Sequence, residues 1–140
     1  MKRVVFDTNI VISGLLWTGR PYQVLQLARS GQVIAVTSEE LIDELRDVLK
    51  RSKFQSALTR RNQSVDNLVS QYTAFAQLVQ PVPLPASLVS DVEDVQVLEA
   101  ALGGGAQVVV SGDDDLLRLK QVFGITVMTA QSFWALHAGQ

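Results

Sequence analysis

The sequence of 140 residues predicts an α/β fold, a three-layer α/β/α sandwich around a central, mainly parallel sheet. Short apolar segments alternate with longer segments in which apolar residues recur at helical spacing. Each predicted strand is almost wholly apolar, which is typical of a sheet that helices cover on both faces. With 47% hydrophobic residues the chain can bury a substantial core, and we expect residues 1–140 to form a single domain.

The predicted elements of the first half follow from apolar spacing and from capping residues. In order, we expect a strand at 4–6, a helix from Pro21 that stops at Gly31, a strand at 33–36, a helix to about Arg51 that Thr37 and Glu40 open as a capping box, and a helix opened by Thr59 that continues to Val79. The proline-rich segment 80–86 cannot be helical and is predicted to be an extended connector.

The second half shows the same alternation of helices and strands. In order, we expect a helix that Ser90 and Glu93 open as a second capping box and that runs to about Gly103, a strand at 107–110, a short helix at 115–120, a strand at 125–127, and a terminal helix capped by Thr129. The chain shows no internal repeat and no low-complexity segment, which agrees with a single folded unit.

Composition excludes several kinds of chemistry. The chain has no cysteine and one histidine, His137, so it offers no disulfide, no thiolate metal site and no pair of histidines for acid–base cleavage. A hydrolase of this composition would depend on carboxylates or on a metal ion that they hold. The sequence has neither a predicted membrane span nor a signal-peptide pattern, and we expect a cytoplasmic protein.

Charge is unevenly distributed along the chain. Residues 46–61 carry six cations and one acid, whereas residues 62–117 contain eight acids and neither lysine nor arginine. A basic patch beside an acidic centre suits a polyanion held near metal-binding carboxylates, although two solvated faces of opposite charge would give the same pattern. The candidate contacts to a nucleic-acid backbone are Lys50, Arg51, Lys53, Arg60 and Arg61. Trp17, Tyr22 and Phe54 are candidates for base stacking, with burial in the core as the more common use of an aromatic residue.

Two acids follow predicted strands. Asp7 comes directly after the strand at 4–6, and Asp113 comes shortly after a later strand. Functional sites of parallel sheets form beyond the carboxyl ends of the strands, but aspartate is also a common turn and helix-capping residue. Beside Asp7, we expect Thr8 to fix the turn and Asn9 to form a hydrogen bond in the same cleft.

Two further acids are selected by their helical faces. Glu44 lies at the edge of the apolar stripe of its helix, and Asp94 falls inside the stripe of the later helix. A carboxylate directed at a core is costly unless a cation lies in front of it. Two other interpretations stay open: Glu44 reaches water, with Arg51 as one partner, or Asp94 only caps its helix. Together Asp7, Glu44, Asp94 and Asp113 would give the set of hard oxygen ligands that suits Mg²⁺ or Mn²⁺.

The order of these motifs resembles the PIN-domain ribonucleases, and within them the VapC-like toxins of toxin–antitoxin pairs. The motifs are a hydrophobic residue followed by D-T-N near the start, S-x-E-x-x-x-E-L at 38–45, an aspartate opening an alanine-rich helix, and V-V-S-G-D-x-D at 109–115. The resemblance implies a PIN-like fold and a single-stranded RNA endonuclease that uses Mg²⁺ or Mn²⁺. It carries the catalytic and metal-binding acids onto Asp7, Glu44, Asp94 and Asp113, and further site positions onto Asn9, Ser111 and Asp115, the last as a ligand or a support.

Further expectations follow from the same resemblance. Asp7, Asp94 and Asp113 would hold one metal ion directly, and Glu44 would complete the site or help to bind a second ion. The products would carry 5′-phosphate and 3′-hydroxyl ends. The protein would form a homodimer, and a small protein antitoxin would inhibit it.

Two other functions remain possible on the sequence. A haloacid-dehalogenase-like phosphotransferase would use Asp7 as its nucleophile, but the D-x-D motif of such enzymes is broken here by Asn9. The other is a non-catalytic RNA-binding module of the same fold.

Overall fold

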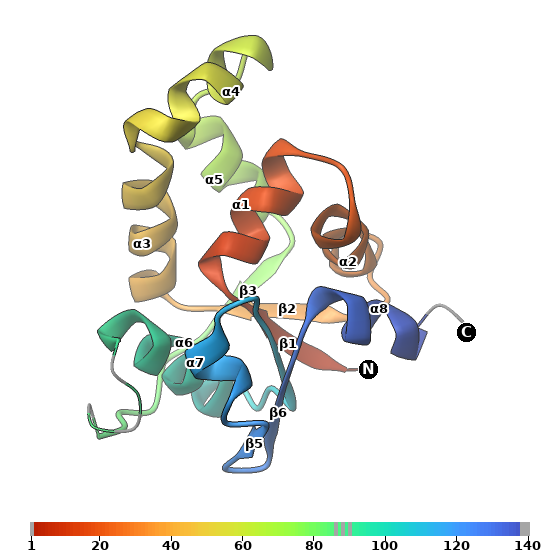
Figure 1. Cartoon of the computed structure of the whole chain (residues 1–140), viewed down its shortest axis with the longest axis vertical. Coiled ribbons are helices and arrows are strands. Elements are labelled where there is room, and N and C mark those ends of the chain that lie inside the picture. Colours follow the sequence, from red (N-terminus) through yellow and green to blue (C-terminus); the bar gives the residue numbers. More distant parts are fainter. Residues whose placement is uncertain (1, 86, 88, 90, 138–140) are drawn as a thin grey trace.

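A six-stranded sheet lies at the centre of the fold (Figure 1). The structure is a computed structural model, and it describes residues 2–85, 87, 89 and 91–137. The strands are β1 (Arg3–Phe6), β2 (Ile34–Thr37), β3 (Ala76–Leu78), β4 (Val108–Val110), β5 (Gln121–Val122) and β6 (Ile125–Met128). Their order is β3-β2-β1-β4-β6-β5, and every neighbouring pair is parallel except β5 and β6. The prediction of a mainly parallel sheet is confirmed.

Helices cover both faces of this sheet. They are α1 (Thr8–Leu16), α2 (Arg20–Arg29), α3 (Glu39–Leu49), the 3₁₀ turn η1 (Ser52–Phe54), α4 (Gln55–Arg60), α5 (Val65–Thr73), α6 (Val92–Gly103), α7 (Asp114–Leu117) and α8 (Ala130–His137). Alternate residues of β1 enter two separate cores. Val4 and Phe6 pack with residues of α1, α2, α5 and α8, whereas Val5 packs with residues of α6 and with Leu116 of α7. The predicted three-layer sandwich is therefore confirmed. Within the described part of the chain, no helix is both long and apolar enough to cross a membrane.

In both helices that were predicted to open with a capping box, the residue that caps the helix is one position later than predicted. Thr37 is the last residue of β2, and Ser38 caps α3 by accepting a hydrogen bond from the Leu41 N–H at 3.3 Å. Asp91 caps α6 by accepting from the Glu93 N–H at 3.0 Å, and the predicted cap, Ser90, lies outside the described residues. The prediction for Thr37 is wrong because Thr37 and Ser38 both carry a hydroxyl that can cap a helix. The strand β2 extends through Thr37, so the helix starts after Ser38.

The predicted helix from Thr59 to Val79 is also wrong. Thr59 lies inside α4, and Asn62, with φ of 54°, leaves the helical conformation. Ser64 starts α5, which ends at Thr73, and the chain then forms the edge strand β3 parallel to β2. A short apolar segment such as 75–79 fits a strand as well as a helix, and pairing with β2 selects the strand.

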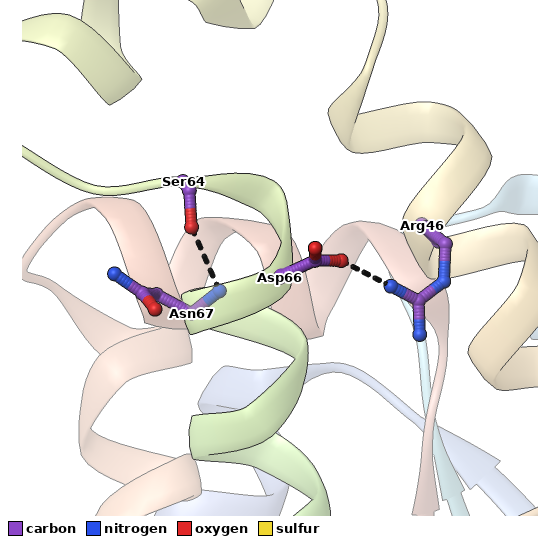
Figure 2. A network of polar contacts seen from close by, with 4 residues as sticks. All are labelled: Arg46, Ser64, Asp66 and Asn67. Carbon is purple, nitrogen blue, oxygen red and sulfur yellow. Dashed lines mark hydrogen bonds and ion pairs between the residues drawn. The ribbon is translucent and has the colours of Figure 1, made fainter.

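An exposed ion pair joins the last turn of α3 to the first turn of α5 (Figure 2). The Arg46 guanidinium donates to Asp66 Oδ1 at 2.6 Å, and the Ser64 hydroxyl accepts the Asn67 N–H at 3.0 Å. Arg46 is thus committed to a structural contact. The five basic residues predicted to contact a nucleic acid lie on the connection between α3 and α5, which includes α4 at the top of Figure 1.

We expect this ion pair to add little stability. The side chains of Arg46 and Asp66 are 36% and 85% exposed, and exposed pairs contribute about 1 kcal/mol or less because water and salt screen them. Arg46→Met should therefore change the free energy of unfolding by less than ~1 kcal/mol in urea denaturation. A double-mutant cycle with Asp66→Ala isolates the pair, and a coupling energy above ~2 kcal/mol would contradict this expectation.

Candidate metal centre

The site lies where β1 and β4 end side by side. Phe6 of β1 pairs with Val110 of β4, and the chain leaves the sheet on opposite sides of this strand pair, as at the switch points where α/β proteins bind ligands. Asp7 accepts the Thr8 N–H at 2.8 Å and caps α1, and Asp113 accepts the Asp115 N–H at 2.9 Å and caps α7. Both acids therefore cap helices and also lie at the predicted edge of the sheet.

Asp94 completes a cluster of three carboxylates. One oxygen from each of Asp7, Asp94 and Asp113 lies within 4.8 Å of the others. Asp94 projects from the first turn of α6 and is 4% exposed, and its buried Oδ2 has no hydrogen-bond partner among the described residues. Its burial confirms the position inferred from the helical stripe. A buried acceptor with no donor beside a second carboxylate is the arrangement that a cation would satisfy.

The electrostatics of the cluster favour a cation. Burial, together with the hydrogen bond and the negative charge of Asp113, raises the pKa of Asp94 to about 8. Burial also raises the pKa of Asp7, although hydrogen bonds from Ser111 and Thr8 act in the opposite direction. Without a cation, the cluster retains a proton at neutral pH because its carboxylates repel one another. A divalent ion would replace that proton, so the residues present fit Mg²⁺ or Mn²⁺.

Ser111 fixes two of the three carboxylates at once. It is fully buried directly after β4, where its hydroxyl donates to Asp7 Oδ2 at 2.8 Å and accepts the Asp113 N–H at 2.9 Å. The hydroxyl thus bridges the ends of β1 and β4. The predicted supporting position of Ser111 has a clear structural basis, because losing the hydroxyl would leave a buried carboxylate oxygen without its donor.

Glu44 lies beside the cluster and is joined to it through Thr8. The Thr8 hydroxyl donates to Glu44 Oε2 at 2.5 Å, which connects α1 to α3. Glu44 is half-buried, burial raises its pKa, and it does not belong to the group of three carboxylates that could share an ion. The sequence indicated only that Thr8 fixes a turn, because the contact depends on how α1 and α3 pack.

A cleft of about 330 Å³ opens from Glu44 between α3 and α6. Among the described residues its lining is mostly acidic, including Asp43, Asp47 and Glu93, with Arg51 as the single cation. Arg51 is therefore the one predicted nucleic-acid contact that lines this cleft. Lys50, Lys53, Arg60 and Arg61 are exposed and lie at or beyond the end of α3.

The remaining predicted site residues lie at the rim. Asn9 is exposed in the first turn of α1, and its predicted hydrogen bond in the cleft stays a prediction. Asp115 pairs with Arg118 at 3.2 Å, one turn further along the chain. The structure thus brings together Asp7, Asp94 and Asp113, with Ser111, Thr8 and Glu44 attached by hydrogen bonds.

Comparisons with known proteins agree with this arrangement. The PIN domain family matches residues 3–115, a range that includes all three clustered aspartates. The fold is similar to the crystal structure of FitAcB from Neisseria gonorrhoeae, with a TM-score of 0.51 and 19% identity over 91% of this chain and 98% of that chain. No curated protein gives a significant match to the sequence. Because the family match spans most of the chain, this protein belongs to the PIN domain family.

Proposed function

We propose that this protein is a metal-dependent endoribonuclease that hydrolyses phosphodiester bonds of single-stranded RNA. The observation that carries the proposal is the largely buried cluster of Asp7, Asp94 and Asp113, in which Asp94 Oδ2 has no hydrogen-bond partner among the residues that the structure describes. Membership of the PIN domain family supports a nuclease. We further propose that residues 1–140 act as a single domain in the cytoplasm.

The three aspartates would hold Mg²⁺ or Mn²⁺, an ion that acidifies water and shields phosphate when bound. Ser111 and Thr8 keep the Asp7 carboxylate in place, so its geometry is set before substrate arrives. Asp94 would have to lose its proton in order to serve as a ligand. Glu44 has one oxygen committed to Thr8, and we assign to its other oxygen, Oε1, the role of orienting the attacking water. The products carry 5′-phosphate and 3′-hydroxyl ends.

We also propose that the protein is the toxin of a type II toxin–antitoxin pair and forms a homodimer. Support comes from the resemblance of its motifs to the VapC-like toxins and from the fold that it shares with the FitAcB structure. The acidic cleft beside Glu44 would accept a cationic segment of a protein antitoxin.

The test uses end-labelled, single-stranded RNA of defined sequence with Mn²⁺, followed by mapping of both new ends. We expect the wild type to cut the RNA and EDTA to prevent cutting. In Asp7→Asn the rate of cutting should fall by more than ~100-fold, because a metal ligand contributes at least as much to metal affinity and activity as the groups that orient it. Asp114→Asn is the matched control, since Asp114 is an exposed acid next to Asp113 and outside the cluster. Intact RNA with the wild type, or equal cutting by Asp7→Asn, would overturn the proposal.

A further inference from the structure

A tryptophan lies partly exposed at the end of α1 that is opposite the metal centre. Trp17 is 40% exposed and lines a pocket of about 200 Å³ together with Ala57, Arg60 and Arg61 of the α4 region. Tryptophan is highly buried on average, so a partly exposed ring that lines a pocket with two arginines is unusual. The pocket is smaller than most sites for whole cofactors, and it suits one planar ring.

The Trp17 backbone is bonded to α1, and its ring packs against one aromatic neighbour. Its backbone N–H bonds to the Ser13 carbonyl at 2.9 Å, which caps α1. The ring contacts buried Phe54, with the two ring centroids 6.3 Å apart. The Lys53 ammonium nitrogen lies over the Phe54 ring, 5.1 Å from its centroid. A supported aromatic side chain whose surface stays accessible is a stacking platform that loses little entropy on binding.

The two arginines of the pocket have no acidic partner. Among the described residues the ion pairs are Arg46–Asp66 and Arg118–Asp115, and Arg60 makes only a 3.5 Å contact to the Ser56 carbonyl. Arg61 is exposed at the C-terminal end of α4. Two uncommitted guanidinium groups beside an aromatic ring match a ligand that joins a planar ring to an anion, as a nucleotide does.

We propose that this pocket is an anchoring subsite for single-stranded RNA, in which one base stacks on Trp17 and the neighbouring phosphates contact Arg60 and Arg61. The inference rests on the proposed function for its choice of RNA. Helix α1 joins the two places, because it starts beside Asp7 and ends before Trp17, a separation of about 14 Å at 1.5 Å per residue. A strand held at both ends of α1 would be cut at a fixed distance from the anchored base.

The experiment measures RNA binding in EDTA, so that no cutting occurs. In a Trp134→Phe background Trp17 is the only tryptophan, and a ten-nucleotide single-stranded RNA should quench its fluorescence, whereas a duplex of equal length should not. Trp17→Leu, measured with labelled RNA, should raise Kd by ~5- to 150-fold, the range expected for one stacked base. Trp17→Phe should keep most of the affinity because it keeps a ring. Phe123→Leu is the control, since Phe123 is an exposed aromatic residue on the β5–β6 turn.

The arginines supply a second measurement that does not alter the tryptophan. Arg60→Gln with Arg61→Gln should reduce the slope of log Kd against log salt concentration by about 0.7 for each phosphate that an arginine no longer neutralises. An unchanged slope would show that Arg60 and Arg61 do not contact RNA phosphates, which contradicts their role in the subsite.

Measurements of RNA binding test the anchoring subsite, whereas measurements of RNA cutting test the proposed metal centre. If Trp17→Leu binds RNA in EDTA as tightly as Phe123→Leu, the anchoring subsite is wrong, even if Asp7→Asn abolishes cutting. If RNA quenches Trp17 but Asp7→Asn still cuts, the subsite stands and the assigned centre fails. If RNA leaves Trp17 fluorescence unchanged and Trp17→Leu converts a dimer into monomers in sedimentation, the pocket is a protein interface and the subsite is overturned.

Discussion

Asp94→Asn should abolish RNA cutting and should make the metal-free protein more stable at pH 8. The asparagine keeps the size of the side chain and a donor toward Asp113, but it removes a charge that the buried site tolerates only beside a cation. We expect cutting to fall by more than ~100-fold, because the ion would have one carboxylate fewer to hold it. Reduced activity together with a gain in stability is the sign of a residue kept for function.

The pH dependence follows from the direction of the shift. The pKa of Asp94 rises from 3.8 to about 8, so between these values the folded, metal-free protein holds a proton that the unfolded chain has released. Its free energy of unfolding should therefore fall as pH rises through this window. Each pKa unit corresponds to ~1.4 kcal/mol, and because the clustered carboxylates titrate together we expect a total fall of a few kcal/mol. Asp94→Asn should flatten this fall, whereas Asp114→Asn should retain it. Urea denaturation at pH 5 and pH 8 in EDTA measures both, and parallel profiles for wild type and Asp94→Asn would contradict the account.

Metal binding should offset this loss of stability at high pH, and more in the wild type than in Asp94→Asn. At a free concentration of 100 times Kd, Mn²⁺ should raise the free energy of unfolding by ~2.7 kcal/mol, and its binding should release a proton near neutral pH. Calorimetry in buffers of different ionisation enthalpy counts that proton. In Asp94→Asn both the stabilisation and the proton release should shrink.

Gly103→Ala should destabilise the fold strongly, although alanine is the better helix former by ~1 kcal/mol. Gly103 is the last residue of α6, and a Cβ there would lie 1.9 Å from the Gln80 carbonyl oxygen and 2.9 Å from the Cα of Pro81. Backbone cannot rotate out of the way as a flexible side chain does. The segment would have to leave α6, where Val82 donates to the Glu99 carbonyl at 3.0 Å.

We expect a decrease of ~3 kcal/mol or more in the free energy of unfolding for Gly103→Ala in thermal or urea denaturation, at the upper end of the range for overpacking. Gly112→Ala is the matched control, because no atom outside its neighbours lies within 4 Å of a Cβ built there. A decrease below ~1 kcal/mol at Gly103 would mean that the connector 79–85 is held less tightly than its hydrogen bonds indicate.

Local sequence patterns predicted the parts of the site that depend on one element each. Asp7 and Asp113 follow apolar strands, and parallel strands end at a common edge, so their proximity followed once β1 and β4 were neighbours. Asp94 was identifiable because a charge inside an apolar stripe conflicts with its surroundings, and the structure buries it.

The features that escaped prediction depend on contacts between elements. The hydrogen bond from Thr8 to Glu44 requires the packing of α1 against α3, and β3 forms because β2 offers a free edge. The two-residue strand β5 was missed because it is too short for any periodicity. The position of α4, beyond the end of α3 in Figure 1, depends on a helical connection whose direction spacing alone does not reveal.

The hydrogen bond between Ser111 and Asp7 joins positions 104 residues apart. During translation β1 leaves the ribosome early, but it has no neighbour β4 and no Asp113 until synthesis is far advanced. The cluster of three aspartates therefore cannot form while most of the chain is still being made.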